Sequence, residues 1–373
     1  MSSKKSGYIN VFESIFLRGI KLNKAGGLKK FWKLNRFLRH AVYSYIKRWI
    51  LLKSKKLLVP IAIAFSPTMQ CNLSCIGCYA ADYPLDDELS LNEIDQLFSS
   101  AEKMGVFLFV ITGGEPLMRE GLLDLLTKHD RLLFLLITNG SLVDSNVASK
   151  IADSGNIIPV VSIDGTREQT DSRRGKGVYE CVERAMRFMK DQDLVFGFSS
   201  TVWNSNYETL CSDHFIDEMI NRGCSLGFYT EYVPIGSDAR WDMLLSDAER
   251  DEFRQRVIEI RNNKSIMVAH LPDDEYGKDC KCRGIESGCV HINTQGYIEP
   301  CPFSHFSADN IKEKSLEEAL RSRFLAEIRS SKAIYRHGRI GCALAENEEL
   351  MKEIAEKTGA KNTNETSDMR LET

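Results

Sequence analysis

The sequence predicts an α/β protein built around a partial (β/α)6 TIM-like barrel, with a basic helical N-terminal extension and a small cysteine-rich C-terminal domain. Short apolar runs alternate with amphipathic stretches from residue 61 to about residue 232, which is typical of strand and helix repeats in a parallel sheet. Polar, glycine-rich segments follow four of these runs in succession. The first sixty residues are strongly basic, and cysteines gather again beyond residue 279.

The apolar runs and the stretches between them give the predicted elements of the barrel. The strands are Ile61–Ser66, Val106–Thr112, Leu132–Thr138, Ile157–Ile163, Val195–Thr201 and Ser225–Tyr232. The helices are Leu91–Lys103 with Ser90 as N-cap, Arg119–Lys128, Asp144–Asp153, Val178–Lys190 and Tyr207–Asn221. Six units are fewer than the eight that close a full barrel, so we expect one open side. The segments CNLSC, TGGEP, TNG and SIDG follow the first four strands, where parallel barrels carry their chemistry.

Four regions are predicted along the chain. Residues 1–58 form the basic extension, 59–270 the barrel, 271–345 the cysteine-rich domain, and 346–373 a C-terminal helix and a disordered tail. In the third region, Val290–Ile292 and Tyr297–Glu299 flank a turn and predict a hairpin, and Ser315–Ser322 predicts a short helix. The stretch from Lys361 onward is polar and lacks periodicity, so we expect it to be disordered.

The basic extension contains a predicted amphipathic helix. Residues 1–60 hold fifteen Lys or Arg against Glu13 alone, so this part carries +14 and the remainder −17 of the net charge of −3. Apolar residues recur at spacings of three and four on one stripe: Leu28, Phe31, Leu34, Leu38, Val42, Tyr45, Trp49 and Leu52. Such a helix either lies in an anionic membrane interface or packs its stripe on the main domain. Basic residues interrupt every window long enough to span a membrane.

Three of the eleven cysteines form the pattern C-x3-C-x2-C at Cys71, Cys75 and Cys78. The N-terminus has no secretory signal, which favours a reducing compartment and metal ligation over disulfides. Three thiolates at this spacing hold three corners of a four-iron cluster and leave one iron without a protein ligand. Zinc is the competing metal on spacing alone, although structural zinc usually has four protein ligands.

These cysteines, together with GGEP at Gly113–Pro116, resemble the radical S-adenosylmethionine (radical SAM) superfamily over residues 61 to 342. The resemblance implies a [4Fe-4S] cluster on the three thiolates, whose open iron binds S-adenosylmethionine. Gly77 departs from the family pattern, which commonly has an aromatic residue there in contact with adenine, so Tyr79 is the candidate replacement.

The resemblance also implies which residues bind S-adenosylmethionine. The GGEP segment would bind the methionine amino group, the residues after the fourth strand the ribose and carboxylate, and an arginine the methionine carboxylate, with Arg173 as the alternative to Arg174. The full set is Tyr79, Gly113, Gly114, Glu115, Pro116, Thr138, Asn139, Ser162, Asp164 and Arg174.

A second group of cysteines, Cys282, Cys289, Cys301 and Cys342, resembles SPASM and twitch domains. The resemblance implies a second, auxiliary [4Fe-4S] cluster with these four ligands. Cys280 in place of Cys282, a histidine (His291 or His305) in place of Cys342, and a zinc knuckle are the alternatives.

The implied function is reductive cleavage of S-adenosylmethionine to a 5′-deoxyadenosyl radical, which abstracts a hydrogen atom from a substrate. A membrane lipid or isoprenoid is one substrate class, and a ribosomally made peptide is the alternative. An alternative of another class is a non-catalytic iron-sulfur or zinc protein that binds nucleic acid through its basic arm, which GGEP disfavours. Candidates for an acid or base lie near strand ends: Tyr229, Glu231, Tyr232, His270 and Asp273.

We expect as partners an electron donor such as flavodoxin or ferredoxin and an anionic membrane surface contacting residues 1–58, rather than nucleic acid. The expected location is the cytoplasm, with peripheral attachment to the inner face of the membrane.

Overall fold

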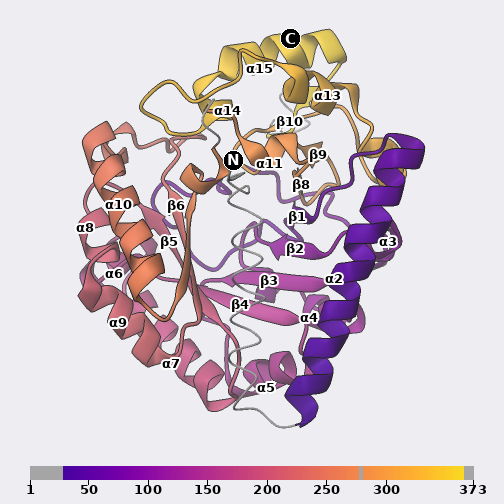
Figure 1. Cartoon of the computed structure of the whole chain (residues 1–373). Coiled ribbons are helices and arrows are strands. Elements are labelled where there is room, and N and C mark those ends of the chain that lie inside the picture. Colours follow the sequence, from indigo (N-terminus) through magenta and orange to yellow (C-terminus); the bar gives the residue numbers. More distant parts are fainter. Residues whose placement is uncertain (1–27, 277–279, 365–373) are drawn as a thin grey trace, which may run out of the picture.

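A computed structural model of the chain describes residues 28–276 and 280–364, with side chains from residue 39 onward (Figure 1). The strands are β1 (Ala62–Phe65), β2 (Leu108–Ile111), β3 (Leu133–Thr138), β4 (Ile157–Ser162), β5 (Gly197–Val202), β6 (Leu226–Glu231), β7 (Met267–Leu271), β8 (Val290–Ile292), β9 (Ile298–Glu299), β10 (Phe306–Ser307) and β11 (Lys361–Asn362). The α-helices are α2 (Leu28–Lys55), α3 (Leu91–Met104), α4 (Leu122–Lys128), α5 (Ser145–Ser154), α6 (Arg167–Arg174), α7 (Val178–Asp191), α8 (Tyr207–Leu210), α9 (Asp213–Arg222), α10 (Asp247–Asn263), α11 (Arg283–Glu286), α12 (Leu316–Ala319), α13 (Arg323–Ser330), α14 (Ala343–Glu346) and α15 (Glu348–Thr358). Short 3-10 helices are η2 (Pro116–Met118), η3 (Trp241–Met243) and η4 (Asp273–Glu275).

The main feature is a nine-stranded sheet in the order β7-β6-β5-β4-β3-β2-β1-β8-β9. All neighbours from β7 to β8 are parallel, and only β9 is antiparallel to its neighbour. Figure 1 shows the sheet curved, with helices such as α4, α5, α7 and α9 on its outer side. The prediction of a partial α/β barrel is therefore confirmed.

Two of the differences from the predicted barrel lie in its later units. A seventh parallel strand, β7, pairs with β6 and extends the predicted six units. The predicted helix Tyr207–Asn221 is divided into α8 and α9, because the Ser212 side chain accepts a hydrogen bond from the Phe215 amide and begins a new helix there. By contrast, the predicted cap at Ser90 forms a full capping box with Glu93.

The strands alternate between an inner face and an outer face of the half-barrel. In β1, Ile63 and Phe65 belong to the main hydrophobic core, whereas Ala62 packs with a separate apolar cluster on the inner face. That cluster also contains Leu108, Leu135 and other inner residues of β2, β3, β4, β6 and β7. The inner face of the barrel is thus apolar toward the amino ends of its strands.

Helix α2 runs along one side of the molecule (Figure 1). Its inner side contacts the body: the Ser44 hydroxyl donates to the Gly105 carbonyl oxygen at 2.6 Å, and Leu51 is buried. The described part of the predicted apolar stripe faces outward, with Tyr45 66% and Trp49 54% exposed. Of the two predicted alternatives, packing of the stripe on the main domain is therefore wrong for residues 42–52. The side chains of residues 28–38 lie outside the described part of the structure. No helix within the described ranges is long and apolar enough to cross a membrane.

The predicted hairpin of the C-terminal region forms as β8 and β9, and its buried centre is Glu299. The Glu299 carboxylate accepts hydrogen bonds from the Tyr83 hydroxyl at 2.8 Å and from the Asn293 amide at 2.9 Å. The Nδ1 atom of His291 lies at 2.6 Å and the Thr363 hydroxyl at 2.5 Å. Because β11 also pairs with β10, residues 361–364 are ordered, whereas the sequence predicted disorder from Lys361.

Replacing Glu299 by Gln should lower the free energy of unfolding of the chain by about 2–4 kcal/mol, measured by urea denaturation. The carboxylate now accepts hydrogen bonds from several buried donors. The Gln amide would instead point its own N–H groups at these donors, in a site that solvent does not reach. Glu313→Gln is the matched control, because Glu313 is exposed, and it should change the unfolding free energy by less than about 0.5 kcal/mol. Equal stability of the two variants would contradict this role for Glu299.

Candidate active site

A cavity of about 1120 Å³ lies inside the half-barrel and continues to the C-terminal region. Residues at the carboxyl ends of the parallel strands line it, as expected for this fold. Both predicted groups of cysteines also line it: Cys71, Cys75, Cys78, Cys282, Cys289, Cys301 and Cys342. The structure therefore brings together on one cavity two groups that lie two hundred residues apart in the sequence.

The loop that carries Cys71, Cys75 and Cys78 is attached to the segments after β3 and to α6. Asn72 accepts from the Asn139 side-chain amide at 2.9 Å and donates to Ser141 at 2.8 Å. The Ile76 amide donates to the Arg173 carbonyl oxygen at 2.9 Å. Partial desolvation raises the pKa of the thiols of the exposed Cys71 and the half-buried Cys75, so a bound metal would have to displace their protons.

The TGGEP segment after β2 lies directly against the residues that precede Cys71. The Gly114 amide donates to the Thr68 carbonyl oxygen at 2.9 Å, and the Glu115 amide to that of Gln70 at 2.8 Å. A Cβ atom on Gly114 would lie 2.2 Å from the Gln70 carbonyl oxygen, and Gly113 has a φ of +98°. Only glycines fit here, because the two backbone segments approach each other so closely.

The side chain of Glu115 is buried at the wall of the cavity. Its carboxylate accepts from the Thr138 hydroxyl at 2.8 Å and from the Asn139 amide at 2.7 Å. Burial nevertheless raises the pKa of Glu115 above its ordinary value. The structure thus brings Thr138 and Asn139 to the site as the residues that orient this carboxylate.

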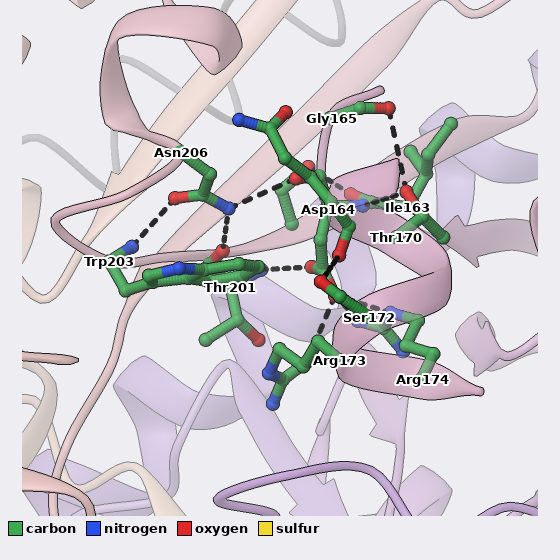
Figure 2. Close-up of polar contacts among 12 residues, drawn as sticks. Ile163, Asp164, Gly165, Thr170, Ser172, Arg173, Arg174, Thr201, Trp203 and Asn206 are labelled. Carbon is green, nitrogen blue, oxygen red and sulfur yellow. Dashed lines mark hydrogen bonds and ion pairs between the residues drawn. The ribbon is translucent and has the colours of Figure 1, made fainter. Parts of the chain in front are cut away.

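The Asp164 carboxylate contacts two arginines, Arg173 and Arg174 (Figure 2). It pairs with Arg173 at 3.0 Å and with Arg174 at 2.6 and 3.1 Å, and it accepts from the Thr201 amide at 2.9 Å. Both arginines and Ser162 line the cavity, whereas Asp164 is fully buried behind them. Burial alone would raise the pKa of Asp164, but the arginines outweigh it and hold that pKa below the ordinary value. Asp164 is therefore placed to position the arginines.

Gly77 is held against an aromatic ring from another strand end. A Cβ atom on Gly77 would lie 2.6 Å from the ring of Tyr232, which follows β6 and lines the cavity. The Tyr79 hydroxyl lies 2.8 Å from that of Thr112 and accepts from the Gly113 amide at 3.1 Å. The ring beside Gly77 is thus Tyr232, and Tyr79 holds the cysteine loop to the TGGEP segment.

The C-terminal cysteines line the other end of the cavity, where Cys342 is buried and Cys282, Cys289 and Cys301 are half-buried. Burial, together with the charge of neighbouring acidic groups and thiols, raises the pKa of Cys282, Cys301 and Cys342. The pKa of Cys289 is raised to about 11 by burial, and the nearby Arg48 of α2 opposes this shift. Thiols with a raised pKa remain protonated when no cation is near. A cationic iron-sulfur cluster would stabilise their thiolate form.

None of the eleven cysteines forms a disulfide in the structure. Within residues 28–276 and 280–364, no three cysteine, histidine or acidic side chains are already gathered closely enough to chelate a metal ion. Glu275 lies beside the C-terminal group, with its carboxylate 3.6 Å from the Cys282 sulfur. No sequence pattern marks Glu275 as a residue of the site.

The alternative histidine ligands are engaged elsewhere. The Nε2 atom of His291 lies 2.8 Å from the Ser66 hydroxyl, and its Nδ1 atom contacts Glu299. The Nε2 atom of His305 lies 3.1 Å from the Pro302 carbonyl oxygen. Cys280 is not among the residues that line the cavity.

The candidates for an acid or base differ in whether they line the cavity. Glu231 and Tyr232 line it, whereas Tyr229 is fully buried and donates to the Leu210 carbonyl oxygen. Glu231 pairs with Arg250 at 2.7 Å and lies 2.9 Å from the Nε2 atom of His270.

The remaining candidate, Asp273, is engaged by Arg254 and Arg336. Burial alone would raise the pKa of Glu231, but His270 and Arg250 lower it below its ordinary value. The role of Arg250 could not be read from the sequence.

Comparisons with known proteins agree with this geometry. The Radical SAM superfamily model matches residues 65–208. The chain is 28% identical over 230 residues to the Fe-coproporphyrin III synthase of Methanosarcina barkeri, covering 60% of this chain and 56% of that protein. It is 26% identical over 298 residues to the AdoMet-dependent heme synthase of Oleidesulfovibrio alaskensis, covering 72% of this chain and 76% of that protein.

The fold is similar to that of SuiB from Streptococcus suis. The SuiB structure bound to S-adenosylmethionine superposes with a TM-score of 0.63 at 17% identity, covering 86% of this chain and 80% of SuiB. The SuiB structure bound to the precursor peptide SuiA gives a TM-score of 0.64 at 16% identity, covering 87% and 81%. At this identity the likeness shows a shared fold.

Replacing Asp164 by Asn should lower the free energy of unfolding by about 3 kcal/mol at neutral pH, because the buried Arg173 and the largely buried Arg174 lose their anion. The pKa of Asp164 is lowered in the folded state, so its contribution is complete above the ordinary carboxyl pKa and is lost as the pH falls through the folded value. The gap between wild type and variant, measured by urea denaturation, should therefore narrow below about pH 4.

The control for this pair is Asp191→Asn, because Asp191 is exposed at the end of α7 and should differ from wild type by less than about 0.5 kcal/mol. A gap for Asp164→Asn that stays constant down to acid pH would show that the ionised carboxylate does not provide the stabilisation.

Proposed function

Because the chain belongs to the radical SAM superfamily, we propose that its cavity performs radical S-adenosylmethionine chemistry on a bound substrate. The observation that carries this proposal is the position of Cys71, Cys75 and Cys78 beside the TGGEP segment on one wall of the cavity. The donor set fits a cluster with one open iron, since three thiolates lie on one loop. When bound, the cluster and S-adenosylmethionine would supply a deoxyadenosyl radical directed at a C–H bond of the substrate.

The residues around the cysteines would orient S-adenosylmethionine. Glu115, held by Thr138 and Asn139, presents a buried carboxylate for an ammonium group. Arg173 and Arg174, fixed by Asp164, would pair with the methionine carboxylate. Ser162 would contact the ribose from the end of β4, and Tyr79 or the ring of Tyr232 beside Gly77 would contact the adenine.

The second cysteine group would hold an auxiliary four-iron cluster. Cys282, Cys289, Cys301 and Cys342 complete a four-thiolate set, which leaves no iron free for substrate. Its task would then be electron transfer, with flavodoxin or ferredoxin as the external donor. Engagement of both candidate histidines supports Cys342 as the fourth ligand.

For the substrate we favour a membrane lipid or isoprenoid. The supporting observation is α2, whose outward side combines exposed Tyr45, Ile46 and Trp49 with basic residues. Amphipathic helices of this composition bind anionic bilayers, and each nearby Lys or Arg contributes roughly 1 kcal/mol. We therefore place the enzyme in the cytoplasm, at the inner face of the membrane.

A peptide is the second candidate substrate, favoured by the likeness to SuiB, which was solved with a precursor peptide. The alternative of a non-catalytic nucleic-acid-binding protein is set aside, because the chain belongs to a superfamily whose relatives here are named as synthases.

Anaerobic reconstitution of the full chain with iron and sulfide should give about eight irons per chain. After addition of dithionite and S-adenosylmethionine, chromatography should detect deoxyadenosine. The variant with Cys71, Cys75 and Cys78 replaced by Ala should retain about four irons and lose deoxyadenosine formation. The matched variant with Cys282 and Cys301 replaced by Ala should retain about four irons on the first site. Wild type that forms no deoxyadenosine would overturn the proposal.

Vesicles that contain phosphatidylglycerol should carry the full chain to the top of a flotation gradient, and vesicles of phosphatidylcholine alone should carry much less. Replacing Tyr45 and Trp49 by Ser should abolish most of the flotation, because the apolar contact with the bilayer is lost. Trp241→Ser is the matched control, since Trp241 is equally exposed but lies outside α2. Equal flotation of the double variant and wild type would exclude this surface.

A further inference from the structure

We propose that the floor of the cavity, its part toward the amino ends of the strands, binds an uncharged hydrocarbon chain of the substrate. This inference deepens the proposed function and rests on it for the reaction at the polar end of the chain. The class of ligand is an acyl or isoprenoid chain.

The floor is formed by inner-face residues of neighbouring strands. Every strand from β1 to β7 except β5 contributes at least one apolar side chain: Ala62, Ala64, Leu108, Val110, Leu133, Leu135, Ile158, Leu226, Phe228 and Ala269. Strand β5 contributes Ser199, which pairs in register with Phe228. Above them the inner face changes to hydroxyl side chains at the carboxyl ends of the strands, including Thr112, Thr138 and Thr230. The cavity therefore has a polar upper layer and an apolar floor.

The charged side chains of the cavity also lie in its upper layer and not on its floor. The charged residues that line the cavity all lie at strand ends or in the segments that follow strands, as do Glu115, Arg174 and Glu231. A bound molecule with a polar reacting end and an apolar body would match this arrangement. Its polar end would then lie near the cysteine loop.

Desolvation distinguishes a hydrocarbon from a peptide on this floor. Apart from the Ser199 hydroxyl, the inner-face side chains offer no hydrogen-bond partner at this level, and the backbone groups of parallel strands are engaged with neighbouring strands. Each peptide N–H or C=O buried there without a partner would cost about 1–3 kcal/mol. Each buried methylene instead gains about 0.8 kcal/mol. The floor thus favours a chain without polar groups.

Three alanines leave the space for such a chain. Ala62 and Ala64 lie on β1, and Ala269 lies on β7, the edge strand of the sheet. Bulky residues usually fill this position in a closed barrel, where the interior is a packed core. Ala41 of α2 packs against the same apolar layer, so one helix separates the floor from the exposed face that includes Tyr45 and Trp49.

Binding of cis-parinaric acid, whose fluorescence rises in an apolar site, tests the proposal with the full chain. Wild type should bind the probe, and palmitate should displace it. Ala64→Phe and Ala269→Phe should each weaken binding at least about tenfold, because a ring occupies the floor, while S-adenosylmethionine binding is unchanged. The control with Tyr45 and Trp49 replaced by Ser should bind the probe as wild type does. Probe affinity that is the same in all four proteins would overturn the proposal.

A photoreactive diazirine analogue of palmitate gives a second measurement that needs no variant. Mass spectrometry should locate the label on β1, β2 or β3 of wild type. Label found only on α2 or on the surface would overturn the proposal, as would displacement of the probe by coproporphyrin but not by palmitate. Deoxyadenosine formation is measured separately, so failure of the radical chemistry and failure of chain binding are distinguishable.

Discussion

The parallel pairing of β8 with β1 is the constraint on which the arrangement of the site depends. The end of β1 leads into the loop with the first three cysteines, and β8 begins directly after Cys289. The ladder continues past β1, because the Ser66 amide donates to the Ile292 carbonyl oxygen at 3.0 Å. The strand that starts the barrel therefore also holds the C-terminal region, and both cysteine groups line one cavity as a result.

Three buried carboxylates then fix the residues around that cavity. Asp164 holds two arginines, Glu115 is held by the segment after β3, and Glu299 joins the hairpin to Tyr83 and to the C-terminal strand pair. Each carboxylate lies in a region of low polarity. There, a charge with hydrogen-bond partners is held rigidly, and a charge without partners destabilises the folded state. The groups that face the cavity are thus oriented by acidic residues one layer behind them.

The sequence was informative where the spacing of residues decides the structure. Alternation of apolar runs identified the parallel barrel, and the positions of the cysteines and of GGEP identified one wall of the cavity. It could not show that Asp164 turns away from the cavity toward two arginines, because such a choice depends on the crossing of β4, β5 and α6. It also could not orient α2: the periodicity of Tyr45 and Trp49 defines a stripe, but the face that packs is decided by Ser44 and Leu51.

The contact between Gly77 and Tyr232 has a consequence for how this site can evolve. The space above the cysteine loop admits one ring, supplied here from the end of β6 because position 77 has no side chain. A lineage that acquired an aromatic residue at position 77 would have to lose the ring at position 232 at nearly the same step, since both cannot fit. Positions 77 and 232 should therefore covary among homologous chains. The aromatic ring would come from one position or the other, and the site would keep a single ring.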